Sequence, residues 1–276
     1  MSLSEIIENL KSKSEQRFDN FSIEAISSIS RIKDDAYLKS PTWLGGDNEF
    51  VCLFVDLDDS SKMSFKKQAR TMAQVYDYFT QNIVDVMSID RFAADYIDIK
   101  GDGAFGIYEG RTAAFKALCA ALTFKTLFDK EIRSKFEHDG KNLNCKLAIH
   151  KDKLLVRKIG KQGDHNNEVW AGRLVNNASK LASLNKKIQA TDLASYGQIM
   201  SYLVISEKIY KELEPKKDFT LTSCGHDING NPTGKGKLWT SIDCSQNEDV
   251  YGDVAYYYSA RWCKHCGDNV MAQMLV

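Results

Sequence analysis

The sequence Cys-Leu-Phe-Val-Asp-Leu-Asp-Asp-Ser-Ser occupies residues 52–61, and Tyr-Ile-Asp-Ile-Lys-Gly-Asp-Gly-Ala-Phe-Gly-Ile occupies residues 96–107. In each stretch, strand-forming residues lead to an acidic residue, Asp56 or Asp102, at a point where the chain turns tightly. If the two strands are neighbours, the two carboxylates meet at one edge of a sheet and offer the oxygen ligands that hard divalent cations prefer. Each acid taken alone also has a structural interpretation, because Asp56 could cap the following helix and Asp102 could be a turn residue.

Composition limits the function classes. The chain has 276 residues, and its 37 basic residues balance 37 acidic residues, which gives no electrostatic case for nucleic acid or an anionic membrane as the main partner. The N-terminus lacks an apolar stretch of the signal-peptide type, and the chain lacks an uninterrupted run of about 18 apolar residues. Seven cysteines, most of them widely scattered, favour a reducing compartment over a disulfide framework. We therefore expect a cytoplasmic protein with one large domain or a domain with extensions.

Strand and helix patterns alternate along the chain. We expect strands over residues 50–55, 95–99, 104–108, 144–150, 154–159 and 203–206, helices over 63–87, 112–136, 172–183 and 207–213, and a closing hairpin built from 219–223 and 237–242. This order predicts an α+β sandwich with a mostly antiparallel sheet covered by helices, similar to the ferredoxin-like repeat. Residues 1–47 are expected to form a helical N-terminal extension, with amphipathic segments near residues 6–10 and 21–32.

Four motifs occur in a fixed order. Asp56 ends the first strand, residues 101–103 read Gly-Asp-Gly, residues 172–181 read Gly-Arg-Leu-Val-Asn-Asn-Ala-Ser-Lys-Leu, and residues 234–237 read Gly-Lys-Gly-Lys. Each motif alone is weak, but their order and spacing resemble the class III nucleotide cyclases over roughly residues 50–243. The resemblance implies a class III cyclase-like fold, with a catalytic domain at residues 48–243 and a C-terminal tail at residues 244–276.

The resemblance also implies a metal and phosphate site. Asp56, Leu57 and Asp102 would bind two Mg²⁺ or Mn²⁺ ions, one activating the ribose 3′-hydroxyl for attack on the α-phosphate and the other neutralising the β- and γ-phosphates. The backbone amides of residues 57–61, at the start of the following helix, would bind phosphate, with help from the Ser60 and Ser61 hydroxyls. An N-cap role for these serines is an equally good interpretation.

In this family the helix with the Gly-x-x-Val-Asn motif comes from the partner subunit of a head-to-tail dimer, so the resemblance implies a homodimer with composite sites. Asn176 would bind the ribose. Lys180 stands where the family has an arginine that stabilises the transition state, and a lysine offers a point charge without a bidentate fork. Lys235 matches the triphosphate-binding lysine, although a solvated loop lysine is the alternative.

Two further positions bear on the base. Adenylate cyclases of this pattern read adenine with a lysine and an aspartate, at the positions that Asp98 and Val169 occupy here, so ATP is disfavoured. An acid at position 98 can accept hydrogen bonds from guanine, cytosine or uracil. A narrower similarity to the bacterial Pycsar pyrimidine cyclases implies cyclic UMP or cyclic CMP, made on phage infection to activate a separate effector. A guanylate cyclase, or a degenerate domain that binds nucleotide without turnover, are the alternatives.

The C-terminal segment contains Cys263-Lys264-His265-Cys266. This spacing is that of half a zinc site, and the second half would have to come from Cys224 and His226, or from Cys244. We therefore consider a structural zinc ion at Cys263 and Cys266. The alternatives are two reduced cysteines in an aromatic-rich tail and, in another function class, a zinc-dependent interaction module.

Overall fold

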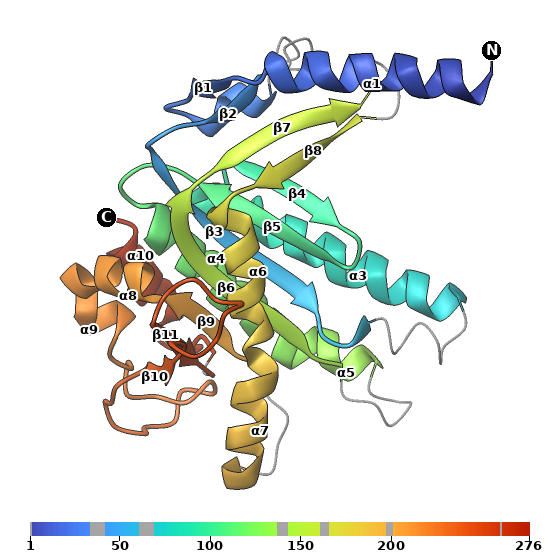
Figure 1. Cartoon of the computed structure of the whole chain (residues 1–276). Helices are drawn as coiled ribbons and strands as arrows, with labels where there is room; N and C mark the ends of the chain where they lie inside the picture. Colours follow the sequence, from blue (N-terminus) through green and yellow to red (C-terminus); the bar gives the residue numbers. More distant parts are fainter. Residues whose placement is uncertain are drawn as a thin grey trace. The chain divides into compact units, whose positions relative to one another are not determined.

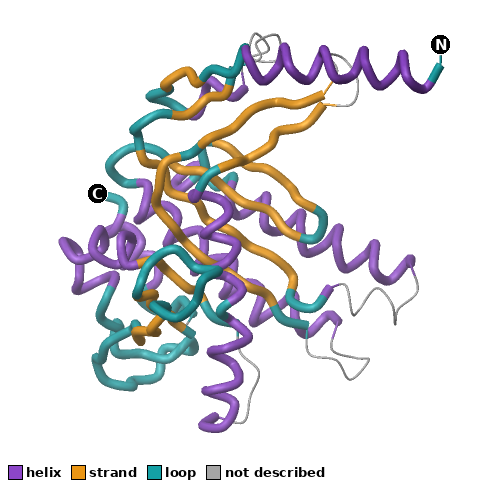
Figure 2. Tube along the Cα trace, in the orientation of Figure 1, coloured by secondary structure: helices purple, strands orange, loops and turns teal. Residues whose placement is uncertain are grey.

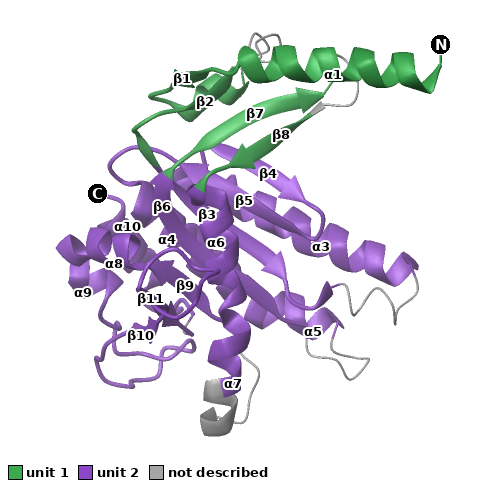
Figure 3. Ribbon diagram, viewed as in Figure 1, with its two compact units in different colours: residues 1–49, 153–172 green, residues 50–152, 173–276 purple. Residues whose placement is uncertain are grey.

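The computed structural model describes residues 2–33, 42–60, 69–136, 143–160, 166–196, 201–259 and 261–276. The chain divides into two compact units (Figure 3): a smaller unit of residues 1–49 and 153–172, and a larger unit of residues 50–152 and 173–276. The expected boundary near residue 47 lies close to the first junction, whereas residues 153–172 group with the N-terminal residues. Within the described part of the chain, no helix is both long and apolar enough to cross a membrane.

The smaller unit begins with helix α1 (Leu3–Asp19), which confirms the helix expected near residues 6–10. A capping box starts this helix: the Ser2 hydroxyl accepts a hydrogen bond from the Glu5 amide at 3.2 Å, and the Glu5 carboxylate accepts one from the Ser2 amide at 2.7 Å. Every side chain of α1 is exposed.

The prediction of an amphipathic helix near residues 21–32 is wrong. Strand β1 (Ile23–Ala25) and a 3₁₀ helix (Ile29–Lys33) occupy that stretch. Strand β1 pairs in parallel with β2 (Trp43–Gly45), and this pairing outweighs a weak helical periodicity.

The sheet of the smaller unit has the order β1-β2-β7-β8. Strand β7 (Leu155–Gly160) confirms the predicted strand and pairs along its whole length with β8 (Asn166–Ala171). We expected a polar loop over residues 160–167 and a helix that opens near Gly172, so β8 was missed. Its sequence, Asn-Asn-Glu-Val-Trp-Ala, has few of the residues that mark a strand by composition.

The larger unit contains, within the described residues, a seven-stranded sheet in the order β10-β11-β9-β6-β3-β5-β4 (Figure 1). Strands β6 and β9 pair in parallel, while β3 with β5, β5 with β4, β9 with β11 and β11 with β10 are antiparallel. This pattern confirms a mostly antiparallel sheet. The strands are β3 (Glu49–Leu57), β4 (Tyr96–Lys100), β5 (Gly103–Tyr108), β6 (Cys145–Lys153), β9 (Leu203–Ser206), β10 (Thr240–Asp243) and β11 (Val254–Tyr258).

The helices of the larger unit confirm each predicted helix, with residues 61–68 of the first one lying outside the described residues. Short segments at α7, α9 and α10 were not predicted. The helices are α3 (Ala69–Met87), α4 (Ala113–Leu127), which continues through a π-helical turn (Phe128–Ile132) into α5 (Arg133–Phe136), α6 (Arg173–Ser183), α7 (Asn185–Tyr196), α8 (Glu207–Leu213), α9 (Lys217–Thr220) and α10 (Gly267–Met274), and 3₁₀ turns cover Asp90–Phe92 and Glu214–Lys216.

The two faces of the larger sheet are covered differently (Figure 1). Alternate residues of β3, among them Leu53 and Val55, are buried in the main core with α3 and α4, as expected when successive strand residues point to opposite faces. On the opposite face, Phe54 packs in a second cluster with Leu181 of α6. Asp56 follows Phe54 by two residues and therefore points to the face that α6 partly covers.

The closing hairpin expected from residues 219–223 and 237–242 is wrong. Phe219 belongs to α9, and the two stretches are joined by the isolated bridge of Thr222 with Lys237 and by a hydrogen bond from the Leu238 amide to the Leu221 carbonyl at 3.0 Å, not by a pair of strands. Strand β10 pairs with β11 over four residue pairs instead. The side chain of Trp239 is buried and donates a hydrogen bond to the Thr220 carbonyl at 2.8 Å, so a side-chain contact replaces the expected ladder.

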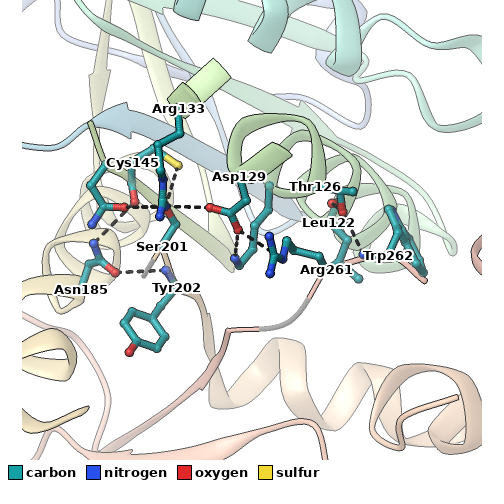
Figure 4. Close-up of polar contacts among 12 residues, drawn as sticks. Leu122, Thr126, Asp129, Arg133, Cys145, Asn185, Ser201, Tyr202, Arg261 and Trp262 are labelled. Carbon is teal, nitrogen blue, oxygen red and sulfur yellow. Dashed lines mark hydrogen bonds and ion pairs between the residues drawn. The ribbon is translucent and has the colours of Figure 1, made fainter. Parts of the chain in front are cut away.

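A buried polar network lies where α4 passes into its π-helical turn (Figure 4). Lys125 is fully buried, and its Nζ lies 2.6 Å from Asp129 Oδ2. Arg133 donates to Asp129 Oδ1 at 2.7 Å and to the Ser201 hydroxyl at 3.1 Å. Burial lowers the pKa of Lys125, and the Asp129 carboxylate opposes that shift. Asp129 therefore compensates two cations that the fold removes from water.

We expect Asp129→Ala to lower the free energy of unfolding by about 3–5 kcal/mol, because it leaves the buried Lys125 ammonium without its counter-charge. Urea unfolding followed by tryptophan fluorescence measures the change. Glu207→Ala is the matched control, since it removes the carboxylate of an exposed i,i+4 lysine pair and should leave the urea midpoint nearly unchanged. Equal effects of the two substitutions would contradict the structural role of Asp129.

Candidate active site

The structure places Asp56 beside Asp102. Strands β3 and β5 pair so that Asp56 lies opposite Gly103, the residue directly after Asp102. A Cβ atom at Gly103 would lie 2.6 Å from the Val55 carbonyl oxygen and 2.8 Å from Asp56 Oδ1. Only glycine allows this approach. Gly101, with φ of 62°, makes the turn between β4 and β5, so both glycines of the motif serve to bring the two acids together.

The two carboxylates have unequal surroundings. Asp102 Oδ2 is buried and makes no hydrogen bond in the structure, whereas Asp56 Oδ2 lies 2.8 Å from Lys146 Nζ. Burial raises the pKa of the Asp56 carboxyl, the Asp102 charge adds to the shift, and the Lys146 ammonium opposes it. A buried acceptor without a donor is costly unless a cation or a donor binds it. The oxygen donors of these two acids therefore fit a hard divalent cation.

The sequence patterns did not identify Lys146 as a residue of the candidate site. It lies on β6 between the buried residues Cys145 and Leu147, on the face of the sheet that carries Asp56. A charged residue within a buried strand is the signal that could have drawn attention to it, because such a charge needs a partner. Its partner, Asp56, is 90 residues away in sequence and could not be identified without the fold.

The acidic turn after β3 is also held by a lysine. Asp58 is only 8% exposed, and its amide donates to the Asn144 carbonyl at 2.8 Å. Lys186, at the start of α7, lies 3.7 Å from Asp58 Oδ1 and 2.7 Å from Asp59 Oδ1. Asp59 has φ of 54°, a conformation that aspartate tolerates better than most residues. Ser60 is half-buried at the end of this turn, and Ser61 lies outside the described residues.

The two adjacent asparagines of helix α6 have different surroundings. Asn177 is buried and holds Tyr251 through two hydrogen bonds: its Oδ1 accepts from the Tyr251 amide at 2.8 Å and its Nδ2 donates to the Tyr251 carbonyl at 3.1 Å. Asn176 is exposed. One turn later, Lys180 is exposed and lies 3.2 Å from Asp249. The residue predicted to bind ribose therefore faces outward, and its neighbour is structural.

Comparison with known proteins identifies the relatives of the chain, although no family model matches it. A protein named uridylate cyclase from Propioniciclava tarda is 28% identical over 267 residues, which cover 95% of this chain and 77% of that protein. Another protein of that name, from Micromonospora echinofusca, is 28% identical over 82% of this chain and 68% of its own length. The crystal structure of the guanylyl cyclase Cya2 matches with a TM-score of 0.54 and 15% identity, over 80% of this chain and 96% of the other.

The chain has the class III cyclase fold. This result confirms the predicted fold class and the resemblance on which it depended. Within the cyclase fold, Asp98 lies on β4 opposite Phe105 of β5, and its Oδ2 pairs with Lys100 Nζ at 2.9 Å. Val169 lies on β8 of the smaller unit and is 42% exposed. Neither position carries a residue of the adenine-reading type.

Lys235 of the cyclase fold lies in a hydrogen-bonded loop and is exposed. The Ser223 amide donates to the Gly236 carbonyl at 2.8 Å, and the Thr233 amide donates to the Gly225 carbonyl at 2.8 Å. Asp227 accepts from the Asn229 and Asn231 amides at 2.8 and 2.9 Å. Asn176 and Lys180 thus lie on one exposed side of α6 and Lys235 lies in an exposed loop, whereas Asp56, Leu57 and Asp102 lie together at the ends of β3 and β5.

The predicted zinc half-site has a second half. Cys224 and His226 lie next to Cys263 and Cys266, with the potential ligand atoms all within 4.8 Å of one another. The cluster could therefore hold a metal ion. Cys244, the other partner that we considered, is buried in the cluster around Leu181 and Tyr202 instead.

The two asparagines of α6 should respond differently to substitution. We expect Asn177→Ala to lower the free energy of unfolding by about 1–3 kcal/mol, because it removes a buried side chain that bonds both backbone groups of Tyr251. Asn176→Ala should leave the unfolding midpoint nearly unchanged, because that side chain is exposed. Thermal and urea unfolding of both variants measure the difference, and a larger loss in Asn176→Ala would contradict the assignment of Asn177 as the structural residue.

Proposed function

We propose that this protein is a pyrimidine nucleotide cyclase, which converts UTP or CTP to the 3′,5′-cyclic monophosphate and pyrophosphate. The observation that carries the proposal is the meeting of Asp56 and Asp102 at one edge of a class III cyclase sheet. Two curated relatives named uridylate cyclase match most of the chain. Their name favours UTP over CTP as the substrate.

Asp56, Asp102 and the Leu57 carbonyl would hold two Mg²⁺ or Mn²⁺ ions. When bound, such ions acidify the ribose 3′-hydroxyl and neutralise the charge of the triphosphate and of the departing pyrophosphate. The buried and unsatisfied Oδ2 of Asp102 supports this assignment. Lys146 balances part of the negative charge at Asp56 and keeps that carboxylate in place before substrate binds.

The remaining residues would act on the substrate from a second copy of the chain. Asn176 would orient the ribose, while Lys180 and Lys235 would meet the phosphates. The Lys180 pair with Asp249 is exposed on both sides, so exchanging that carboxylate for a phosphate costs little. Because Lys180 replaces the arginine of the family, we expect slower turnover than a bidentate guanidinium would give.

Asp98 would read the base. A carboxylate accepts from uracil N3 or cytosine N4, and it repels the acceptor N1 of adenine. The Lys100 ammonium beside it would orient the carboxylate. Val169 would make an apolar contact with the base, at the position where adenylate cyclases have the aspartate that binds adenine.

We further propose, from the resemblance to the Pycsar cyclases, that the cyclic nucleotide is a messenger in anti-phage defence and activates a separate effector. A protein that binds nucleotide without turnover is the alternative, favoured by the lysine at position 180. Product formation separates these two functions directly.

The decisive assay incubates the protein with each nucleoside triphosphate and Mn²⁺ or Mg²⁺, and identifies products by mass spectrometry. We expect cyclic UMP or cyclic CMP with pyrophosphate. Asp102→Asn should lower the rate at least about 100-fold, whereas Asp98→Asn should lower kcat/KM for the preferred pyrimidine roughly tenfold or more and weaken its discrimination against other bases. Cyclic GMP as the sole product would identify a guanylate cyclase, and no product from any triphosphate would favour the non-catalytic alternative.

The composite site predicts complementation between inactive variants. Asp102→Asn and Asn176→Ala remove residues from opposite halves of the proposed site, so each heterodimer of the two variants keeps one intact site. After mixing equal amounts under conditions that allow subunit exchange, we expect about a quarter of the wild-type activity. Asp56→Asn mixed with Asp102→Asn is the matched control and should stay inactive, because both substitutions affect the same half. An inactive first mixture with demonstrated subunit exchange would refute the composite site.

A further inference from the structure

The Cys224–His226–Cys263–Cys266 cluster joins two segments about 40 residues apart in sequence. The potential ligand atoms lie within 4.8 Å of one another, and Cys266 Sγ lies 3.9 Å from His226 Nδ1. Tetrahedral zinc with Zn–S bonds of about 2.3 Å separates thiolate ligands by about 3.8 Å. A modest contraction of the cluster therefore gives tetrahedral geometry, and three sulfurs with one imidazole form a known set of ligands for structural zinc.

Backbone groups around the cluster orient its cysteine and histidine side chains. The His265 amide donates to Cys263 Sγ at 3.3 Å, a contact that stabilises a thiolate ligand. The Gly267 amide donates to the Cys263 carbonyl at 2.9 Å and closes the turn between the two cysteines. Gly225, between Cys224 and His226, has φ of 85°, which lets the chain present both side chains to the same point.

Hydrogen bonds outside the cluster fix the positions of the two segments that carry it. The Trp262 amide donates to the Thr126 hydroxyl at 2.8 Å (Figure 4), and its indole donates to the Thr123 hydroxyl at 3.0 Å. These bonds fix the residue before Cys263 to α4. The Lys264 amide donates to the Ile228 carbonyl at 3.3 Å. The four ligands are thus preorganised by a framework that does not include them.

His265 is excluded from the cluster although it lies between the two cysteines. Its ring packs against Gly230, where a Cβ atom would approach to 2.6 Å of His265 Cδ2. His226 takes the fourth place instead. The sequence therefore contains two nearby histidines of which the structure selects one, and this choice makes a specific test possible.

We propose that Cys224, His226, Cys263 and Cys266 bind one structural zinc ion, which fastens the loop that carries Lys235 to the C-terminal segment. The link to Lys235 is short: a Cβ atom at Gly225 would lie 3.5 Å from Lys235 Cγ. The closed set of four protein ligands leaves no open position for substrate, so the ion stabilises the loop and takes no part in cyclisation. The site is separate from the acid pair of the proposed function.

A disulfide is the competing use of three neighbouring thiols. It would join two cysteines and leave the third thiol and His226 without a role, whereas zinc uses all four side chains. Mass spectrometry after alkylation under native and denaturing conditions distinguishes the two states, because zinc-bound cysteines are alkylated once the protein is denatured and disulfide-bonded cysteines are not.

The test is the metal content of the full-length protein, purified without a histidine tag and without chelators. We expect about one zinc per chain by inductively coupled plasma mass spectrometry. His226→Gln and Cys266→Ser should lose most of that zinc, while His265→Gln is the matched control and should keep it. Replacement by Co²⁺ should give the visible absorption bands of a tetrahedral thiolate site in the wild type and in His265→Gln, but not in His226→Gln.

Hydrogen exchange supplies a readout that does not depend on activity or on any variant. Chelation of the wild type should accelerate amide exchange in residues 223–237 and 262–274 and leave strands β3 and β5 protected. Failure to find zinc after expression in zinc-supplemented medium, a disulfide within the cluster, or zinc retained by His226→Gln would each overturn the proposal. Zinc at full stoichiometry in a protein without cyclase activity would refute the proposed function alone.

Discussion

The antiparallel pairing of β3 with β5 is the constraint on which the candidate site depends. It sets Asp56 against Gly103, where no side chain larger than hydrogen fits, and so brings two carboxylates into one half-buried place. Burial raises the pKa of the Asp56 carboxyl and the nearby Asp102 charge adds to that shift, while the Lys146 ammonium opposes it. The unsatisfied Oδ2 of Asp102 then leaves the site short of positive charge. The Mg²⁺ or Mn²⁺ ions of the proposed function would supply that charge.

Much of this arrangement could be predicted because its determinants are local. A run of strand residues ending in an acid, and a glycine on each side of a second acid, each describe a turn that a few neighbouring residues define. The order of four such motifs then identified the fold class. The strand β8 and the partner of β10 could not be predicted in this way, since both depend on which distant backbone supplies hydrogen bonds rather than on their own composition.

Ion pairs between residues far apart in the sequence could not be predicted either. Lys146 and Lys186 both contact the acidic turn after β3, but they are 90 or more residues away from it in sequence. The choice between Asn176 and Asn177 is of the same kind. Helical geometry separates neighbouring residues by about 100°, so the two side chains point in different directions. The Tyr251 backbone that Asn177 binds is identified only in the folded chain. The Cys–His cluster could be predicted in part. Cys263 and Cys266 form a recognisable motif, whereas their partners were one of two candidate sets.

Exposure divides the proposed catalytic residues into two groups, and this division has a physical reason. Asp56 and Asp102 are partly buried and held by their own chain, as residues that must hold metal ions in a fixed geometry should be. Asn176 and Lys180 are exposed one turn apart on α6, and Lys235 is exposed in a loop before β10. In a site shared by two chains, exposure is required, because each residue must reach across an interface to a substrate that the other chain binds. The exposed state of these three side chains is what the proposed site between two copies of the chain requires.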